Sequence, residues 1–260
     1  MAADNSFPPN PAAPLPFFKR ILQPSDRAVA PEKRLSGQRL VVTAEFPLRA
    51  GLGLSGRADI SDRDRWHWKC RLLNCSEHGV RMQLGAAVAA AAGEPCDLKL
   101  DLEGFELVVP CLISNSRRQG DRTFLGLKHA IADAETQGAY HQFLEIVALG
   151  ATLRLTVRRN QPTGSEYQVE QYVSARRSCL NVWRHPATGQ VAAAELLLRD
   201  CLVRVVAGRL EYFAGPEATA THRATPEQAL EIHRLFHWVV PNLSLSVPED
   251  VRKFLQQHAA

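Results

Sequence analysis

Two stretches of alternating apolar and polar residues, joined by a short polar turn, constrain the fold of this chain more than any other feature. The first runs over Trp66–Leu73 and the second over Val80–Leu84. Alternation with a period of two is typical of a strand that buries one face. The residues between the two stretches, Asn74–Gly79, are mostly turn formers. The sequence therefore predicts two strands that meet at a polar corner.

The side chains of this corner are suited to binding a ligand. Asn74 and Ser76 carry hydrogen-bond donors and acceptors. Gly79 can adopt a positive φ or let a ligand approach the backbone closely. The corner is therefore the first candidate for a functional site.

Further alternating runs on either side predict a small antiparallel barrel. Strands are expected over residues 40–46, 96–102, 105–114 and 123–129. Residues 103–104 are expected to form a hairpin turn. Residues 49–64 and 116–122 are expected to be loops, because they are rich in glycine or polar residues. Residues 133–149 carry apolar side chains at helical spacing and predict a helix after the last strand, which suggests a closed barrel with a helical plug.

Asn74, Ser76 and Gly79 fit the pattern (D/N)xSxxG, and this stretch resembles the signature of the PilZ family, bacterial receptors for cyclic di-GMP. The order of elements is also similar to that of PilZ domains, in which a basic segment precedes the first strand and a helix closes the domain. The resemblance covers about residues 31–149. It implies a PilZ-like six-stranded antiparallel β-barrel with a C-terminal helix.

The PilZ signature has a second part, an RxxxR motif before the first strand, whose arginines bind guanine edges and phosphate. Arg39 lies immediately before the first expected strand, but position 35 is Leu35; Arg34 is one place and Lys33 two places away from the expected position. Gly37 could let this segment bulge and bring Arg34 into register. The cyclic di-GMP site that the resemblance implies consists of Arg34, Arg39, Asn74, Ser76 and Gly79, with Lys33 as a further member.

Two literal RxxxR matches occur elsewhere, at Arg118–Arg122 and Arg154–Arg158. Both follow the corner in the chain, and about two such matches are expected by chance in so arginine-rich a sequence. The spacing alone therefore assigns neither of them a role.

The resemblance implies a non-catalytic receptor that binds cyclic di-GMP as its ligand, has no cofactor and relays the signal to an unidentified protein partner. The alternative is a degenerate PilZ adaptor that binds no nucleotide and acts through protein–protein contacts. The extra residue between Arg34 and Arg39 leaves both interpretations open.

Catalytic and metal sites are poorly supported by the sequence. Cys75, Ser76 and His78 share the corner, but adjacent turn residues usually point apart and no third group is evident that would orient a base. His233 and His237 have the spacing of a zinc-binding helix, yet the HExxH motif is absent. We therefore expect no enzyme and no metal site.

The remaining chain predicts two further regions. Residues 1–30 are rich in proline and alanine and are expected to be a disordered tail. Residues 150–260 resemble no family that we recognise; they predict several strands and then two helices, the first beginning at Thr225 with a capping box. The expected fold class is therefore mainly β (α+β), with a barrel domain over residues 31–149 and an α+β domain after it.

Composition places the chain among ordinary globular proteins. Its net charge is only +4, and its arginine clusters lack interleaved aromatic residues, so a nucleic-acid partner is not expected. Neither a membrane span nor a signal peptide is evident, and we expect a cytoplasmic protein with six buried, reduced cysteines. Trp66 and Trp68 are expected in the barrel core, and Trp183 and Trp238 in a second core.

Overall fold

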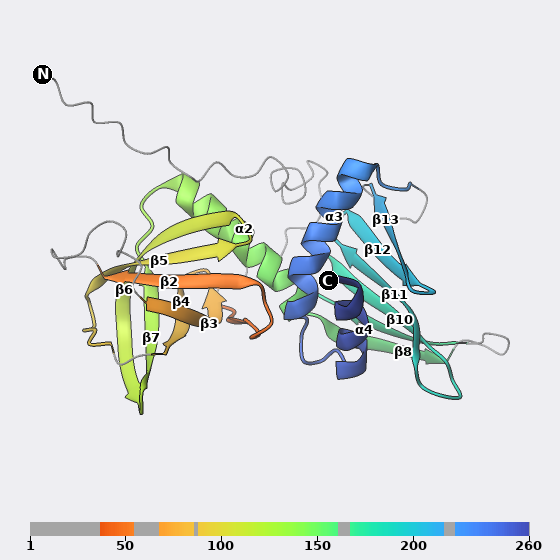
Figure 1. The fold of residues 1–260 in the computed structure, drawn as a ribbon, viewed down its shortest axis with the longest axis horizontal. Helices are drawn as coiled ribbons and strands as arrows, with labels where there is room; N and C mark the ends of the chain where they lie inside the picture. Colours follow the sequence, from red (N-terminus) through yellow and green to blue (C-terminus); the bar gives the residue numbers. More distant parts are fainter. Residues whose placement is uncertain (1–36, 55–67, 86–87, 161–166, 216–221, 260) are drawn as a thin grey trace, which may run out of the picture.

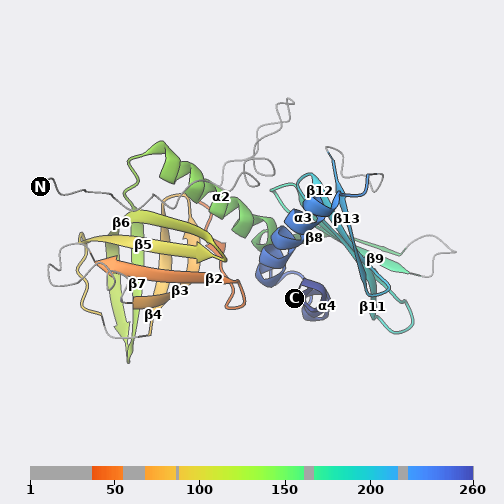
Figure 2. The ribbon, with the colours of Figure 1, turned by 45° about the horizontal axis from the view of Figure 1, so that its top comes forward.

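The computed structural model describes residues 37–54, 68–85, 88–160, 167–215 and 222–259. Within these ranges the chain forms two antiparallel β-sheets and three α-helices. The sheets lie at opposite ends of the molecule, and helices α3 and α4 lie between them (Figures 1 and 2).

The first sheet closes into a barrel of six antiparallel strands, as the sequence predicted. Its strands are β2 (Leu48–Leu54), β3 (Trp68–Ser76), β4 (Gly79–Leu84), β5 (Pro95–Leu102), β6 (Phe105–Gln119) and β7 (Arg122–His129). They pair in the order β3-β2-β5-β6-β7-β4, and pairing of β4 with β3 closes the ring. A short strand, β1 (Leu40–Val41), adds to β3.

Alternating apolar residues fill the barrel interior. Along β5, for example, Cys96, Leu98 and Leu100 are all fully buried, while the residues between them are partly exposed. The hairpin from β5 to β6 turns at Glu103-Gly104, where both residues have positive φ, as in a type I′ turn. This turn is where the sequence predicted it.

Three expectations about the barrel were wrong. The strand expected over residues 40–46 ends at Val41, and the glycine-rich stretch expected to be a loop contains β2. The glycines of β2 alternate with Ala50 and Leu52, which are buried, so the stretch has the strand period in spite of its composition. The loop expected over residues 116–122 is a continuation of β6 and β7, and only Gly120-Asp121 separates the two strands.

The polar corner is also shorter than predicted. β3 continues to Ser76 and β4 begins at Gly79, so that the turn consists of residues 77 and 78 alone. The pairing register shifts between Leu72 and Asn74, so that the buried side chain after Leu72 is that of Cys75 instead of Asn74. Trp68 is only partly buried against the core, and Trp66 lies outside the described residues.

The second sheet is a six-stranded antiparallel meander. Its strands are β8 (Arg154–Asn160), β9 (Gln168–Val173), β10 (Ser178–Arg184), β11 (Val191–Leu198), β12 (Cys201–Val206) and β13 (Arg209–Ala214), paired in chain order. Helices α3 (Pro226–Val239) and α4 (Glu249–Ala259), joined by the 3-10 turn Val240–Asn242, follow it. Thr225 and Gln228 form the predicted capping box. Trp238 is fully buried as expected, whereas Trp183 lies on the opposite face of the sheet and is partly exposed.

Helix α2 (Ala134–Ala151) connects the barrel to the second sheet, and Asp133 caps its N-terminus. The ring centroids of Phe143 and of Phe46, which precedes β2, are 6.5 Å apart. Towards the other end of α2, the backbone carbonyl of Leu149 accepts a hydrogen bond from the Ser178 hydroxyl of β10 at 2.6 Å. One continuous cluster of buried apolar residues consequently runs from the barrel to the second sheet.

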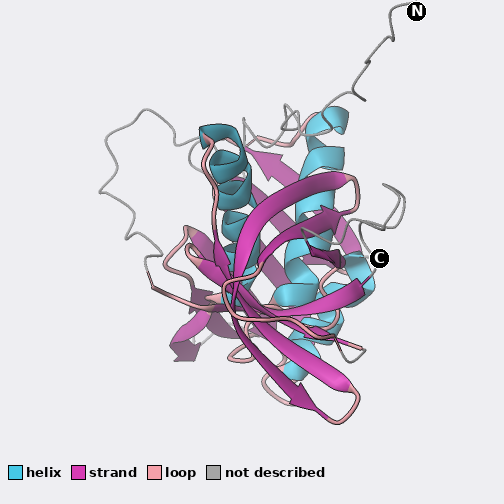
Figure 3. Cartoon of the chain, turned by 90° about the vertical axis from the view of Figure 1, so that its left-hand side faces the viewer, coloured by secondary structure: helices cyan, strands magenta, loops and turns pink. Residues whose placement is uncertain are grey.

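Polar contacts join the barrel to the C-terminal helices. The Glu103 carboxylate accepts a hydrogen bond from Trp238 Nε1 at 2.8 Å, and His237 Nε2 lies 3.2 Å from the same carboxylate. The side chain of Asn242, which is buried, accepts from the backbone N–H of Thr43 at 2.9 Å. Seen from the barrel side in Figure 3, the helices lie behind the barrel strands. Among the described helices, none has the length and apolar composition needed to cross a membrane.

Candidate functional site

Pairing of β1 with β3 brings the two predicted parts of the site together. Leu40 lies opposite Cys75 and Val41 opposite Asn74, so that Arg39, just before β1, lies beside the end of β3. Arg39 Nη1 donates a hydrogen bond to Asn74 Oδ1 at 3.2 Å. Residues 35 positions apart in sequence are thus neighbours on the outside of the barrel.

The other members of the predicted arginine motif lie outside the described residues. Lys33 and Arg34 precede residue 37, where the described part of the chain begins. Gly37 has φ +82°, a conformation that favours glycine. The role of Arg34 beside Arg39 consequently remains a prediction from the sequence.

Ser76 is held in place on both sides of the turn. Its hydroxyl donates to the carbonyl oxygen of Gly79 at 3.1 Å, and its own carbonyl accepts from the hydroxyl of Tyr140, on α2, at 3.0 Å. Burial of Tyr140 raises the pKa of its phenol well above the usual value, so this group stays a donor. The turn is therefore anchored directly to helix α2.

Gly79 is required for a reason that differs from the two we predicted. Its φ is not in the left-handed region. A Cβ atom at this position would instead overlap the carbonyl oxygen of Leu127 on β7. The glycine thus allows β7 to approach the start of β4, and this contact fixes the position of the corner.

β7 also supports the turn from behind. The backbone N–H of His129 donates to the carbonyl of His78 at 3.0 Å, and His129 Nδ1 lies 3.2 Å from the carbonyl oxygen of Glu77. A carbonyl can only accept, so Nδ1 carries the proton. Desolvation by burial lowers the pKa of His129, which favours this neutral form.

Two basic residues that the signature motifs do not include lie beside the corner. Arg81 of β4 is opposite Asn74, and Lys128 of β7 is opposite Gly79. Both are exposed. Alternation alone would have placed Arg81 on the outer face, two residues after Gly79.

We refer to Arg39, Asn74, Ser76, Arg81 and Lys128 as the corner platform. Cross-strand partners lie on the same face of a sheet, which places the last four on the outside of the barrel around the turn. The platform combines an amide and a hydroxyl with three cationic side chains, a combination suited to an anionic ligand with hydrogen-bonding edges.

The corner does not assemble a nucleophile and its base. The Cys75 side chain is fully buried in the barrel, which raises the pKa of its thiol, and the Ser76 hydroxyl is directed to Gly79. His78 is exposed. All six cysteines of the chain lie in described strands and are free thiols; Cys70 and Cys179 are only partly buried, contrary to the expectation that all would be buried.

The two histidines of α3 have separate partners. His233 Nδ1 lies 2.8 Å from the hydroxyl of Tyr212, and His237 Nδ1 lies 2.6 Å from the carbonyl oxygen of Ala259. In the part of the chain that the structure describes, no three His, Cys, Asp or Glu residues are grouped in a way that could hold a metal ion.

Comparisons with known proteins do not identify the chain. No protein-family model matches it, and the search of curated proteins finds no match. The interpretation of the corner platform therefore depends on its geometry and on the signature residues that it contains.

Proposed function

We propose that this protein is a PilZ-type receptor that binds cyclic di-GMP on the corner platform. The observation that carries the proposal is the hydrogen bond between Arg39 and Asn74. It joins the basic segment before β1 to the (D/N)xSxxG corner, the two elements whose combination the resemblance requires.

The chemistry of the platform fits this ligand. Cyclic di-GMP presents two guanine edges and two phosphodiesters. An arginine can donate two parallel hydrogen bonds to O6 and N7 of guanine, a role suited to Arg39. Arg81 and Lys128 supply positive charge for phosphate, while Asn74 offers both donor and acceptor atoms.

In this proposal the barrel (residues 31–149) is the receptor domain and the C-terminal α+β part (residues 150–260) transmits the signal to a protein partner. A hydrogen bond joins Tyr140 of α2 to Ser76, and the end of α2 is hydrogen-bonded to the second sheet. Ligand binding acts as a switch when the ligand prefers one arrangement of these parts over another.

Calorimetric titration of the purified chain with cyclic di-GMP tests the proposal. We expect saturable binding that is lost or strongly weakened in Arg39→Ala and Ser76→Ala. Arg209→Ala is the matched control, because Arg209 is an exposed arginine on β13 of the other sheet. Arg39→Ala and Arg209→Ala should keep the thermal midpoint of the parent, whereas Ser76→Ala, which loses the hydrogen bond to Gly79, should lower it slightly.

A flat titration, with no thermal shift at saturating nucleotide, would contradict the receptor function. The adaptor function would then be favoured, in agreement with the extra residue between Arg34 and Arg39. Binding that survives Arg39→Ala would contradict the location of the site.

A further inference from the structure

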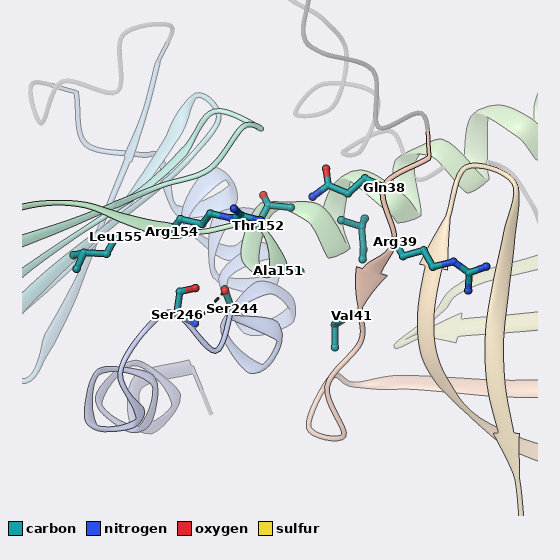
Figure 4. Close-up of a pocket in the computed structure, with 10 residues that line it drawn as sticks. Gln38, Arg39, Val41, Ala151, Thr152, Arg154, Leu155, Ser244 and Ser246 are labelled. Atoms are coloured by element: carbon teal, nitrogen blue, oxygen red, sulfur yellow. Dashed lines mark hydrogen bonds between the residues drawn. The ribbon is translucent and has the colours of Figure 1, made fainter.

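A polar cleft of about 500 Å³ lies beside the corner platform, between the barrel and the second sheet (Figure 4). β1 forms one wall, the C-terminal end of α2 forms the floor, and β8 with the loop that precedes α4 forms the other wall. The lining residues are Gln38, Arg39, Leu40, Val41, Ala151, Thr152, Arg154, Leu155, Ser244 and Ser246.

The charged residues of this lining are all cationic. Arg154 contributes a guanidinium group, Arg39 lines the cleft while its guanidinium is directed to Asn74, and none of the described lining residues is acidic. Thr152 already donates its hydroxyl to the carbonyl of Ala148 at 2.7 Å, so the hydroxyl of Ser246 and the amide of Gln38 are better placed to serve a ligand. An anion with several acceptor oxygens suits such a lining.

The cleft also exposes apolar side chains. Val41 is 60% exposed and Leu155 is 41% exposed, although both lie in strands. Each offers surface to a flat apolar group, so that the cleft presents cationic and apolar surface together. A nucleotide, which joins a phosphate to a planar base, has this combination of properties.

The cleft and the corner platform are continuous. Arg39 belongs to both, and Val41 lies directly opposite Asn74 on β3. In Figure 4 the Arg39 side chain turns away from the cleft, while Arg154 extends along its floor beside Thr152. A ligand that contacts Asn74 and passes over Val41 therefore approaches Arg154.

We propose that the nucleotide bound at the corner platform extends over Val41 into this cleft, where Arg154 of the second sheet binds one of its phosphates. This inference rests on the proposed function and deepens it. It assigns to Arg154 a ligand contact that the spacing of Arg154 and Arg158 in the sequence did not justify. One ligand would then contact both sheets, and its affinity would depend on how they are arranged.

Calorimetric titration of Arg154→Ala with cyclic di-GMP tests the inference. Loss of a charge-assisted contact to phosphate at this exposed position should weaken binding about tenfold. Arg154→Lys, which keeps the charge but loses the planar donor fork, should lie between Arg154→Ala and the parent. Arg209→Ala, an exposed arginine of the same sheet, should bind like the parent.

The outcomes separate this inference from the proposed function. If the parent binds, Arg39→Ala does not, and Arg154→Ala binds like the parent, then the receptor function stands and the role of Arg154 is wrong. If the parent itself does not bind, both are overturned. Equal weakening in Arg154→Ala and Arg209→Ala would show a nonspecific effect of charge and would also refute the contact.

Discussion

Removal of a single hydroxyl group, in the variant Tyr140→Phe, tests how the corner is held. The Tyr140 side chain is 1% exposed, and its hydroxyl donates to the backbone carbonyl of Ser76 at 3.0 Å. Phenylalanine keeps the ring and its packing but leaves that carbonyl without this donor. A buried polar group that loses its partner costs about 1–3 kcal/mol, and we expect a loss of about 1.5 kcal/mol in unfolding free energy.

For a chain of this size, a loss of that order lowers the thermal midpoint by about 3–6 °C, which differential scanning calorimetry resolves. Tyr212→Phe is the matched control, because its hydroxyl also makes one hydrogen bond, to His233 at 2.8 Å, at a site far from the corner. Both variants should be destabilised. Only Tyr140→Phe should also weaken the binding of cyclic di-GMP, because only this variant releases the turn that carries Ser76.

Two results would refute this reasoning. If Tyr140→Phe is as stable as the parent, the hydrogen bond to Ser76 does not contribute to the fold. If Tyr140→Phe and Tyr212→Phe change nucleotide affinity equally, the link between α2 and the corner has no specific role.

Three further predictions concern the packing of the barrel. Gly79→Ala places a methyl group against the carbonyl of Leu127, and chemical denaturation should show a loss of about 1–3 kcal/mol in unfolding free energy. Unchanged stability would contradict the close packing of β7 on the corner. Burial lowers the pKa of His129 in the folded state, so the unfolded chain binds its proton first as the pH falls. The stability of the protein should therefore decline below about pH 6.5. His129→Gln should flatten this decline in denaturation curves measured at several pH values. Burial raises the pKa values of the Cys75 and Cys111 thiols, so these two should resist a thiol reagent in the native protein and react only on unfolding. Mass spectrometry of the labelled peptides would check this expectation. Rapid labelling of the native protein would contradict the burial of the two thiols.

Much of the barrel follows from sequence periodicity. β4 and β5 alternate strictly, and the turn between β5 and β6 and the helix α2 were predicted close to their observed bounds. β2 was missed because its glycines suggested a loop, although Ala50 and Leu52 have the period of a strand. Composition was misleading where the period of two was informative.

The candidate site was only partly accessible to sequence reasoning. Arg39 and Asn74 were selected from motifs, and their contact depends on the register of β1 on β3, which no local pattern fixes. Arg81 joins them through the β3–β4 hairpin, whereas Lys128 joins them through the pairing of β4 with β7, which are distant in the sequence. The reason for Gly79 lies in the Leu127 backbone, about fifty residues later, and could be found only once the barrel was closed.

The most direct test of the proposed cyclic di-GMP site is nuclear magnetic resonance of isotope-labelled protein titrated with cyclic di-GMP. The largest shifts of backbone amide signals should fall on Arg39, on residues 74–81 and on Lys128, and they should saturate together. Shifts confined to other surfaces, or no shifts at saturating nucleotide, would contradict the assignment of the corner platform as a cyclic di-GMP site.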